Sequence, residues 1–122
     1  MTNYYYKVCE IWSDGSLQSV LAPPRARVQY QIGERTVPHE GCGPLGVFGS
    51  KGEAVAYLDC ITRHTHKVFE CEASNVREPA ESGKIMWSLC LYLLADEYRP
   101  SGTLLADAVT LTRKLTEEEL SS

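Results

Sequence analysis

Short segments in which polar and apolar residues alternate recur along this 122-residue chain and limit what it can fold into. In the segment that begins at Ala26, one face carries Arg27, Gln29 and Gln31, and the apolar face carries Ala26, Val28, Tyr30 and Ile32. Residues Lys67–Val76 and Leu104–Leu115 alternate in the same way. A period of two is the period of a β-strand with one face toward solvent. These segments therefore predict a sheet whose two faces differ in polarity.

The N-terminal segment predicts a β-hairpin. Tyr4–Trp12 is rich in aromatic and β-branched residues, which favour strands, and Ser13–Ser16 follows with the composition of a turn. Leu17–Ala22 then reads as the second, antiparallel strand, and Pro23-Pro24 ends it.

One helix is predicted in the middle of the chain. A long glycine-rich loop over Gly33–Gly49 is interrupted only by a short candidate strand, Leu45–Phe48. Ser50 and Glu53 then form a capping box, in which each side chain accepts from the other residue's unpaired amide. Apolar residues at helical spacing predict that the helix continues to about His64.

The C-terminal third predicts a second helix and a last strand. Ile85–Tyr98 has apolar residues at helical spacing, although a buried strand is the alternative. Leu104–Leu115 is predicted as one strand, and residues 116–122 as a short or frayed helical tail. The fold class is therefore α+β: an antiparallel sheet, barrel-like in one reading, with one or two packed helices in a single domain over residues 1–122.

The composition limits the classes of function. Hydrophobic residues make up 43% and charged residues 23% of the chain, as in a globular domain, and the net charge is −4. An acidic balance argues against a protein that coats duplex DNA or RNA, but it allows one small anionic ligand held by a few arginines. The N-terminus lacks the pattern of a secretory signal, and the longest apolar run, Leu89–Ala95, is too short to span a bilayer. We therefore expect a cytoplasmic protein with reduced cysteines.

The residues that can carry catalysis or bind a metal form no complete set. Cys60 and His64 have helical spacing for two metal ligands, and His66 and Cys71 are close in sequence, but no C-x-x-C or H-x-x-x-H pair completes a site of four. Cys42 lies between two glycines, which suits an exposed nucleophile and equally suits a tight turn. No pair of carboxylates is isolated in an apolar setting. We expect neither a metal nor a cofactor.

Arginines next to aromatic residues are the remaining candidates. Arg113 falls on the face of the last predicted strand that also carries Val109, Leu111 and Leu115. Such a guanidinium either pairs with a carboxylate of the same chain or grips an anion at the mouth of a pocket. Arg63 and Arg99 are similar candidates. Trp87 and Tyr98 are either core residues or flat surfaces on which a base stacks.

The order of several short motifs resembles a known family. The motifs are YKVCEIWSDGSL, VQYQIGERTVP, GPLGVFGSKGEAVAYL, KVFECEASNVR and PSGTLLADAVTLTRKL. Together they resemble the phage anti-Thoeris proteins, the first family of Thoeris anti-defence sponges, over roughly residues 4–115. That family is non-enzymatic and sequesters cyclic ADP-ribose isomers; some members also bind the cyclic oligonucleotides of CBASS defence.

The resemblance implies a ligand site, an assembly and a location. The family pocket uses arginines for the pyrophosphate and an aromatic side chain for the base, and the best matches are Arg63, Trp87 and Arg113. An asparagine expected near Trp87–Tyr98 is missing, and Asp96 is the nearest polar side chain. The predicted ligand-binding residues are Arg63, Trp87, Asp96, Tyr98, Arg99 and Arg113. The family also implies a homodimer or a higher even oligomer such as a hexamer, in the cytoplasm of an infected bacterial host.

Two other functions stay open on sequence grounds. A small protein–protein interaction module, such as an inhibitor of a host enzyme, also suits the acidic balance and the seven tyrosines. A thiol enzyme that uses Cys42 is the third. Aromatic residues on both faces of Tyr4–Trp12 add to the expectation of an oligomer, because a single helix covers only one face.

Overall fold

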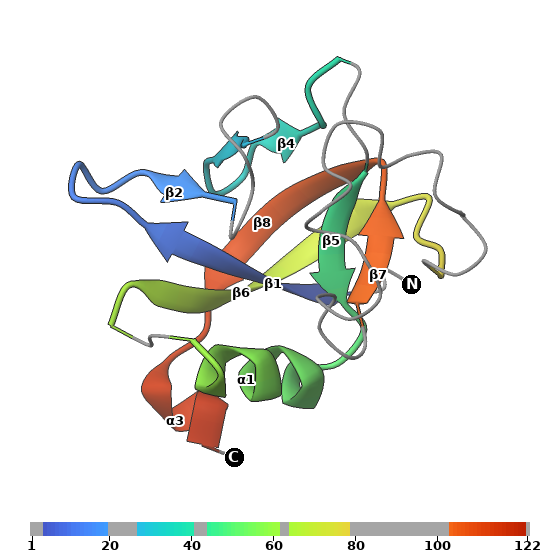
Figure 1. Cartoon of the computed structure of the whole chain (residues 1–122). Helices are drawn as coiled ribbons and strands as arrows, with labels where there is room; N and C mark the ends of the chain where they lie inside the picture. Colours follow the sequence, from blue (N-terminus) through green and yellow to red (C-terminus); the bar gives the residue numbers. More distant parts are fainter. Residues whose placement is uncertain (1–3, 20–26, 41–43, 62–63, 79–102, 122) are drawn as a thin grey trace.

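The computed structural model describes residues 4–19, 27–40, 44–61, 64–78 and 103–121. They form an α+β fold, as predicted, in which an eight-stranded antiparallel sheet carries two short helices (Figure 1). The strands are β1 (Tyr5–Ile11), β2 (Leu17–Gln18), β3 (Gln29–Tyr30), β4 (Arg35–Thr36), β5 (Leu45–Phe48), β6 (His66–Ser74), β7 (Thr103–Ala106) and β8 (Ala108–Lys114). The helices are α1 (Lys51–Asp59) and α3 (Glu117–Ser121).

The long strands β1, β6 and β8 form the centre of the sheet. The strand order along the main path is β3-β2-β1-β6-β8-β4, and β5 pairs with both β1 and β7 beside that path. Both helices lie at the same end of the molecule, below β1 and β6 in Figure 1. The sheet is not closed into a barrel, because β3 and β4 at the two ends of the path do not pair.

The central strands bury both of their faces, each in its own hydrophobic cluster. Cys9, Phe69 and Leu111 belong to the cluster that faces away from the helices. Val8 and Val68 belong to the other cluster, together with α1 and α3 residues. The aromatic residues on both sides of β1 are thus partly covered within one chain, and the predicted oligomer stays a prediction.

Several predicted elements are confirmed. The N-terminal hairpin forms with Glu10 opposite Gln18. Ser50 caps α1: its Oγ accepts from the Glu53 amide at 3.2 Å and donates to the Glu53 carboxylate at 3.0 Å. The tail over residues 117–121 is helical, and its Leu120 is buried.

Other boundaries differ from the prediction. The helix ends at Asp59 instead of His64, with Cys60 as its C-cap. The strand predicted over Leu104–Leu115 is two strands, because Asp107 turns outward and its amide donates to the Ser74 carbonyl at 2.9 Å. Ile32, predicted on a buried face, is 54% exposed because the chain turns directly after β3. The helix predicted over Ile85–Tyr98 lies outside the described residues.

Candidate functional site

Of the predicted ligand-binding residues, the structure describes only Arg113. Arg63, Trp87, Asp96, Tyr98 and Arg99 lie outside the described residues, and so does the candidate thiol Cys42. Their roles stay predictions.

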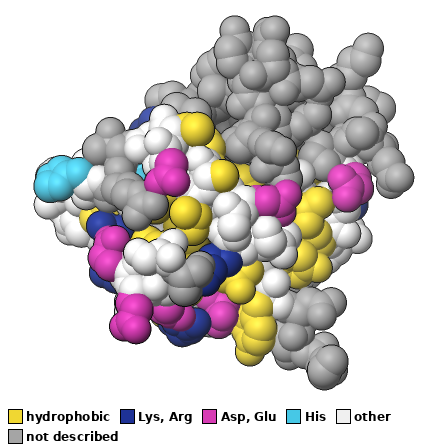
Figure 2. Space-filling view, turned by 90° about the horizontal axis from the view of Figure 1, so that it is seen from below, with side chains coloured by type: hydrophobic (Ala, Val, Ile, Leu, Met, Phe, Trp, Pro, Cys, Tyr) yellow, Lys and Arg dark blue, Asp and Glu magenta, His cyan; other side chains and the backbone are white. Residues whose placement is uncertain are grey.

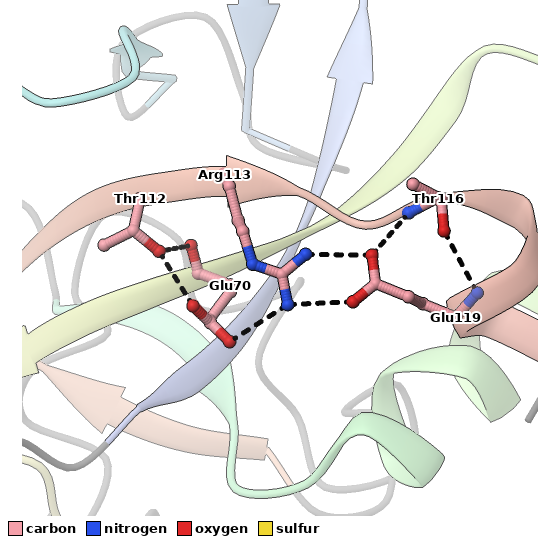
Figure 3. A network of polar contacts seen from close by, with 5 residues as sticks. All are labelled: Glu70, Thr112, Arg113, Thr116 and Glu119. Atoms are coloured by element: carbon pink, nitrogen blue, oxygen red, sulfur yellow. Dashed lines mark hydrogen bonds and ion pairs between the residues drawn. The ribbon is translucent and has the colours of Figure 1, made fainter.

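Arg113 lies at the surface and pairs with two carboxylates (Figure 3). Its two terminal nitrogens each reach one oxygen of Glu119 at 2.8 Å, and Nη2 lies 3.5 Å from Oε2 of Glu70. The bidentate hydrogen bonds from Arg113 and the bond from the Thr116 amide lower the pKa of Glu119 to about 2. The same partner, Glu119, raises the pKa of Arg113. Arg113 thus holds the start of α3 against β6, which is the intramolecular alternative weighed above.

The expected position of Arg113 on the same face as Val109 and Leu111 is wrong, because a β-bulge changes the face it points to, and of the three apolar residues only Leu115 stays on its side. Glu70 pairs with Arg113 while the next residue, Cys71, pairs with Leu111, so Thr112 is an extra residue in β8. One extra residue moves every later side chain to the opposite face. Leu111 therefore faces the cluster away from the helices, whereas Arg113 faces the helices along with Glu70.

Two of the described cysteines, Cys9 and Cys71, do not offer an activated thiolate. Cys9 and Cys71 are fully buried, and burial raises the pKa of each thiol to about 12, although the nearby Lys7 ammonium acts in the opposite direction. Cys60 is exposed at the end of α1. Within the described ranges, no three histidine, cysteine, aspartate or glutamate side chains gather as metal ligands do.

A groove lies where the sheet fails to close. β3 and β4 stand at opposite ends of the strand path, yet only residues 31–34 connect them, so the sheet curls until its two ends meet. Figure 1 shows β4 at the top of the molecule beside the cyan segment that contains β3. We call the gap between the two strands the seam. It holds a hollow of about 450 Å³, lined by Val28, Gln29, Gln31, Glu34, Arg35, Thr36, Val37 and His39.

The two ends of the seam are bridged. At one end a turn joins the strands: the Glu34 amide donates to the Gln31 carbonyl at 3.1 Å, and Gly33 adopts a φ of +88°, which favours glycine. At the other end His39 Nε2 lies 2.7 Å from the Arg27 carbonyl oxygen. A carbonyl only accepts, so Nε2 carries the proton in this bond. The groove is thus a stretch of open sheet edge that is bounded at both of its ends.

Arg35 is the cationic group of this groove. Arg77 forms an ion pair with Asp107 at 3.0 Å, and Arg113 is paired with Glu119. Arg35, in contrast, is exposed and forms no ion pair with any carboxylate among the described residues. Its guanidinium can therefore bind an anion without first giving up a partner.

An aromatic–cation stack lies next to the end of the seam that the His39–Arg27 bond bridges. The Arg27 guanidinium carbon is 4.8 Å from the centre of the Trp12 ring, and the Trp12 indole nitrogen donates to Glu10 at 3.0 Å. Trp12 keeps 38% of its surface exposed. The sequence carried one signal for this region, the polar face with Arg27, Gln29 and Gln31, but it gave no reason to place Arg35 opposite that face.

A second cationic group is buried beside the seam strands. Lys7 is 8% exposed; its Nζ donates to the Gly46 carbonyl at 2.6 Å and lies 5.2 Å from the centre of the Tyr30 ring. The Tyr30 hydroxyl is buried and forms no hydrogen bond of good geometry with a described residue. Lys7 therefore belongs to the core. The accessible cationic group at the seam is Arg35.

Charges of both signs are mixed over the face that carries the helices. Figure 2 shows acidic and basic side chains next to one another there, with hydrophobic side chains between them. In the described part of that face, no broad basic surface of the kind that tracks a nucleic-acid backbone is present.

Comparison of the chain with known protein families, curated proteins and solved structures found no match. None of the helices in the described ranges is long and apolar enough to cross a bilayer.

Proposed function

We propose that this chain is a non-enzymatic binding protein that captures a small anionic ligand of the nucleotide class, and that the seam holds it. The unpaired guanidinium of Arg35 on the groove carries the proposal. Gln29, Gln31 and His39 add polar groups around it, and the volume of the hollow falls within the usual range of small-molecule sites. The resemblance in sequence supports a cyclic ADP-ribose isomer as the ligand, and removal of an immune signal of a bacterial host as the consequence.

Calorimetry with a cyclic ADP-ribose isomer and with ADP-ribose tests the proposal. Arg35→Gln removes the charge and keeps a polar side chain, and we expect affinity to fall about 10- to 100-fold, as for the loss of one charge-assisted hydrogen bond of about 1.5–3 kcal/mol. Arg113→Gln is the matched control. It removes the same charge from a guanidinium that already has two carboxylate partners, so we expect affinity within about twofold of the wild type.

Two outcomes contradict the proposal. If the wild type and Arg35→Gln bind the ligand with equal affinity, the ligand does not bind at the seam. The loaded protein is denatured by heat and the released ligand is identified by mass spectrometry. If only cleaved ligand is recovered, the protein hydrolyses the ligand instead of capturing it.

A protein–protein interaction module is the second candidate. Ile32 and Val37, beside and in the seam, are 54% and 47% exposed, and exposed apolar side chains in a polar rim are typical of interaction surfaces. A thermal-shift screen separates the two functions, because a ligand at 100 times its Kd adds about 2.7 kcal/mol to the free energy of unfolding. A flat response across cyclic nucleotides favours the module.

A further inference from the structure

The hydrogen bonds of β3 show which way its main chain faces. The Ser19 amide donates to the Val28 carbonyl at 3.1 Å, and the Val28 amide donates to Ser19 Oγ at 3.1 Å. Both main-chain groups of Val28 therefore point toward β2. Successive residues of a strand alternate, and Gln29 pairs with Gln18 in the next position of the ladder. The N–H and the C=O of Gln29 must then point away from β2.

His39 shows that this free edge faces the seam. Arg27 precedes Val28 by one residue, so its carbonyl points the same way as the groups of Gln29, and that carbonyl receives the bond from the His39 ring. A heteroaromatic N–H thus already occupies one position on the edge. The next position along it belongs to Gln29, which lines the groove.

We infer that the main chain of Gln29 binds the polar edge of a planar heterocycle, so that the seam selects a ligand with a nucleobase as well as a phosphate. The inference rests on the proposed function and deepens it. One extended residue offers a donor and an acceptor side by side on the same side of the strand. The hydrogen-bonding edge of a nucleobase offers the complementary pair, an acceptor next to a donor. Arg35, on the opposite strand of the seam, takes the phosphate.

An extended peptide is the competing occupant, since free strand edges also accept an added strand. The shape of the seam favours the heterocycle. β3 and β4 are two residues long, and the turn over residues 31–34 and the His39–Arg27 bond block both ends of the edge. An added strand needs to run along an edge, whereas a single ring fits between the two blocks.

Proline substitution tests the main-chain contact directly. Gln29→Pro removes the N–H that faces the seam and leaves every bond between β2 and β3 intact, which is the setting in which strands tolerate proline. Gln29→Ala is the control, because it removes the side chain and keeps the N–H. For ADP-ribose we expect Gln29→Pro to bind about tenfold more weakly than Gln29→Ala, and the difference between Gln29→Ala and the wild type measures the contribution of the side chain. For ribose 5-phosphate, which has no base, we expect the two variants to bind equally.

Hydrogen exchange gives a second measurement that does not depend on a variant. Saturation of the wild type with ADP-ribose is expected to slow exchange of the Gln29 amide strongly, and ribose 5-phosphate is expected to leave it unchanged. Unchanged exchange with ADP-ribose, or equal affinity of the Pro and Ala variants for it, overturns the inference. If Arg35→Gln still weakens ADP-ribose binding in that case, the proposed function stands; if Arg35→Gln has no effect, the proposed function fails as well. Protection of Gln29 by an acidic peptide but not by ADP-ribose also overturns the inference.

Discussion

Replacement of the buried Lys7 by methionine is expected to stabilise the protein. The Lys7 ammonium has three N–H donors, and among the described residues it has one acceptor, the Gly46 carbonyl at 2.6 Å, together with the face of Tyr30. No carboxylate among the described residues pairs with it. A charge so placed has lost its water, and the described residues give it less than a full set of partners.

The magnitude follows from three opposing contributions. Desolvation of a buried ammonium costs several kcal/mol after relaxation. The charge-assisted bond to Gly46 returns about 1.5–3 kcal/mol, and the contact with the Tyr30 ring returns up to about 2 kcal/mol. Burial lowers the pKa of Lys7, whereas Tyr30, Cys9 and Cys71 raise it, and the net effect is a raised pKa. The three neighbours attract the ammonium by charge only when they are themselves ionised. Burial raises the pKa of these three groups, so they give no such support at neutral pH.

Methionine keeps most of the buried stem and removes the charge, so we expect the free energy of unfolding to rise by about 1–3 kcal/mol. At about 4 °C per kcal/mol for a domain of this size, Tm rises by roughly 4–12 °C. Urea and thermal unfolding at pH 7 measure both quantities. Lys67→Met, at a partly exposed lysine 3.9 Å from Glu117, is the control and is expected to change stability little. A loss of stability in Lys7→Met would refute the reasoning, since the partners of the ammonium would then outweigh its desolvation.

Three further predictions concern stability. Tyr30→Phe removes a buried hydroxyl without a well-formed bond and is expected to leave Tm unchanged or to raise it; a fall of several degrees contradicts this. Arg113→Gln is expected to destabilise the protein at pH 7, and the difference from the wild type is expected to vanish between about pH 4.5 and pH 2, because the lowered pKa of Glu119 stabilises the fold only while its carboxylate is charged. Urea unfolding at pH 7 and pH 2 checks it, and a difference at pH 2 as large as that at pH 7 counts against the pairing. Ser50→Ala is expected to cost about 1 kcal/mol through loss of the bond from the Glu53 amide to the cap, with Ser121→Ala, in the last residue of α3, as a control.

The sequence predicted the central strands and the first helix well because strong local signals define them. The period-two pattern of β6 and the N-cap of Ser50 arise from residues close in the chain, and both appear in the structure as expected, although the Glu53 carboxylate accepts from the Ser50 hydroxyl and not from the Ser50 amide. The prediction of a single strand over Leu104–Leu115 was wrong for the same reason, because it relied on local pattern alone. Its apolar run continues through the turn at Asp107, so periodicity alone gave no sign that the chain passes from β7 to β8 there.

The candidate site could not be predicted in this way, because its geometry depends on strand pairing between distant segments. The bulge at Thr112 is set by the register of β8 against β6, and this single extra residue turns Arg113 from an apolar face toward Glu70 and Glu119. A pattern read from the sequence assumes strict alternation and so places this arginine on the wrong side.

The seam also depends on strand pairing, in this case on the pairing of the whole sheet. β4 is too short to leave a periodic signal, and β3 and β4 are each held by a different partner strand, β2 or β8. Only the curl of the whole sheet brings Arg35 opposite the polar face that carries Gln29. What the sequence did contain was the composition of the site, a guanidinium and amide side chains on short polar strands. Their placement around an unpaired edge follows from a sheet whose two end strands, β3 and β4, do not pair, because a closed barrel would have used the main chain of Gln29 in its own ladder.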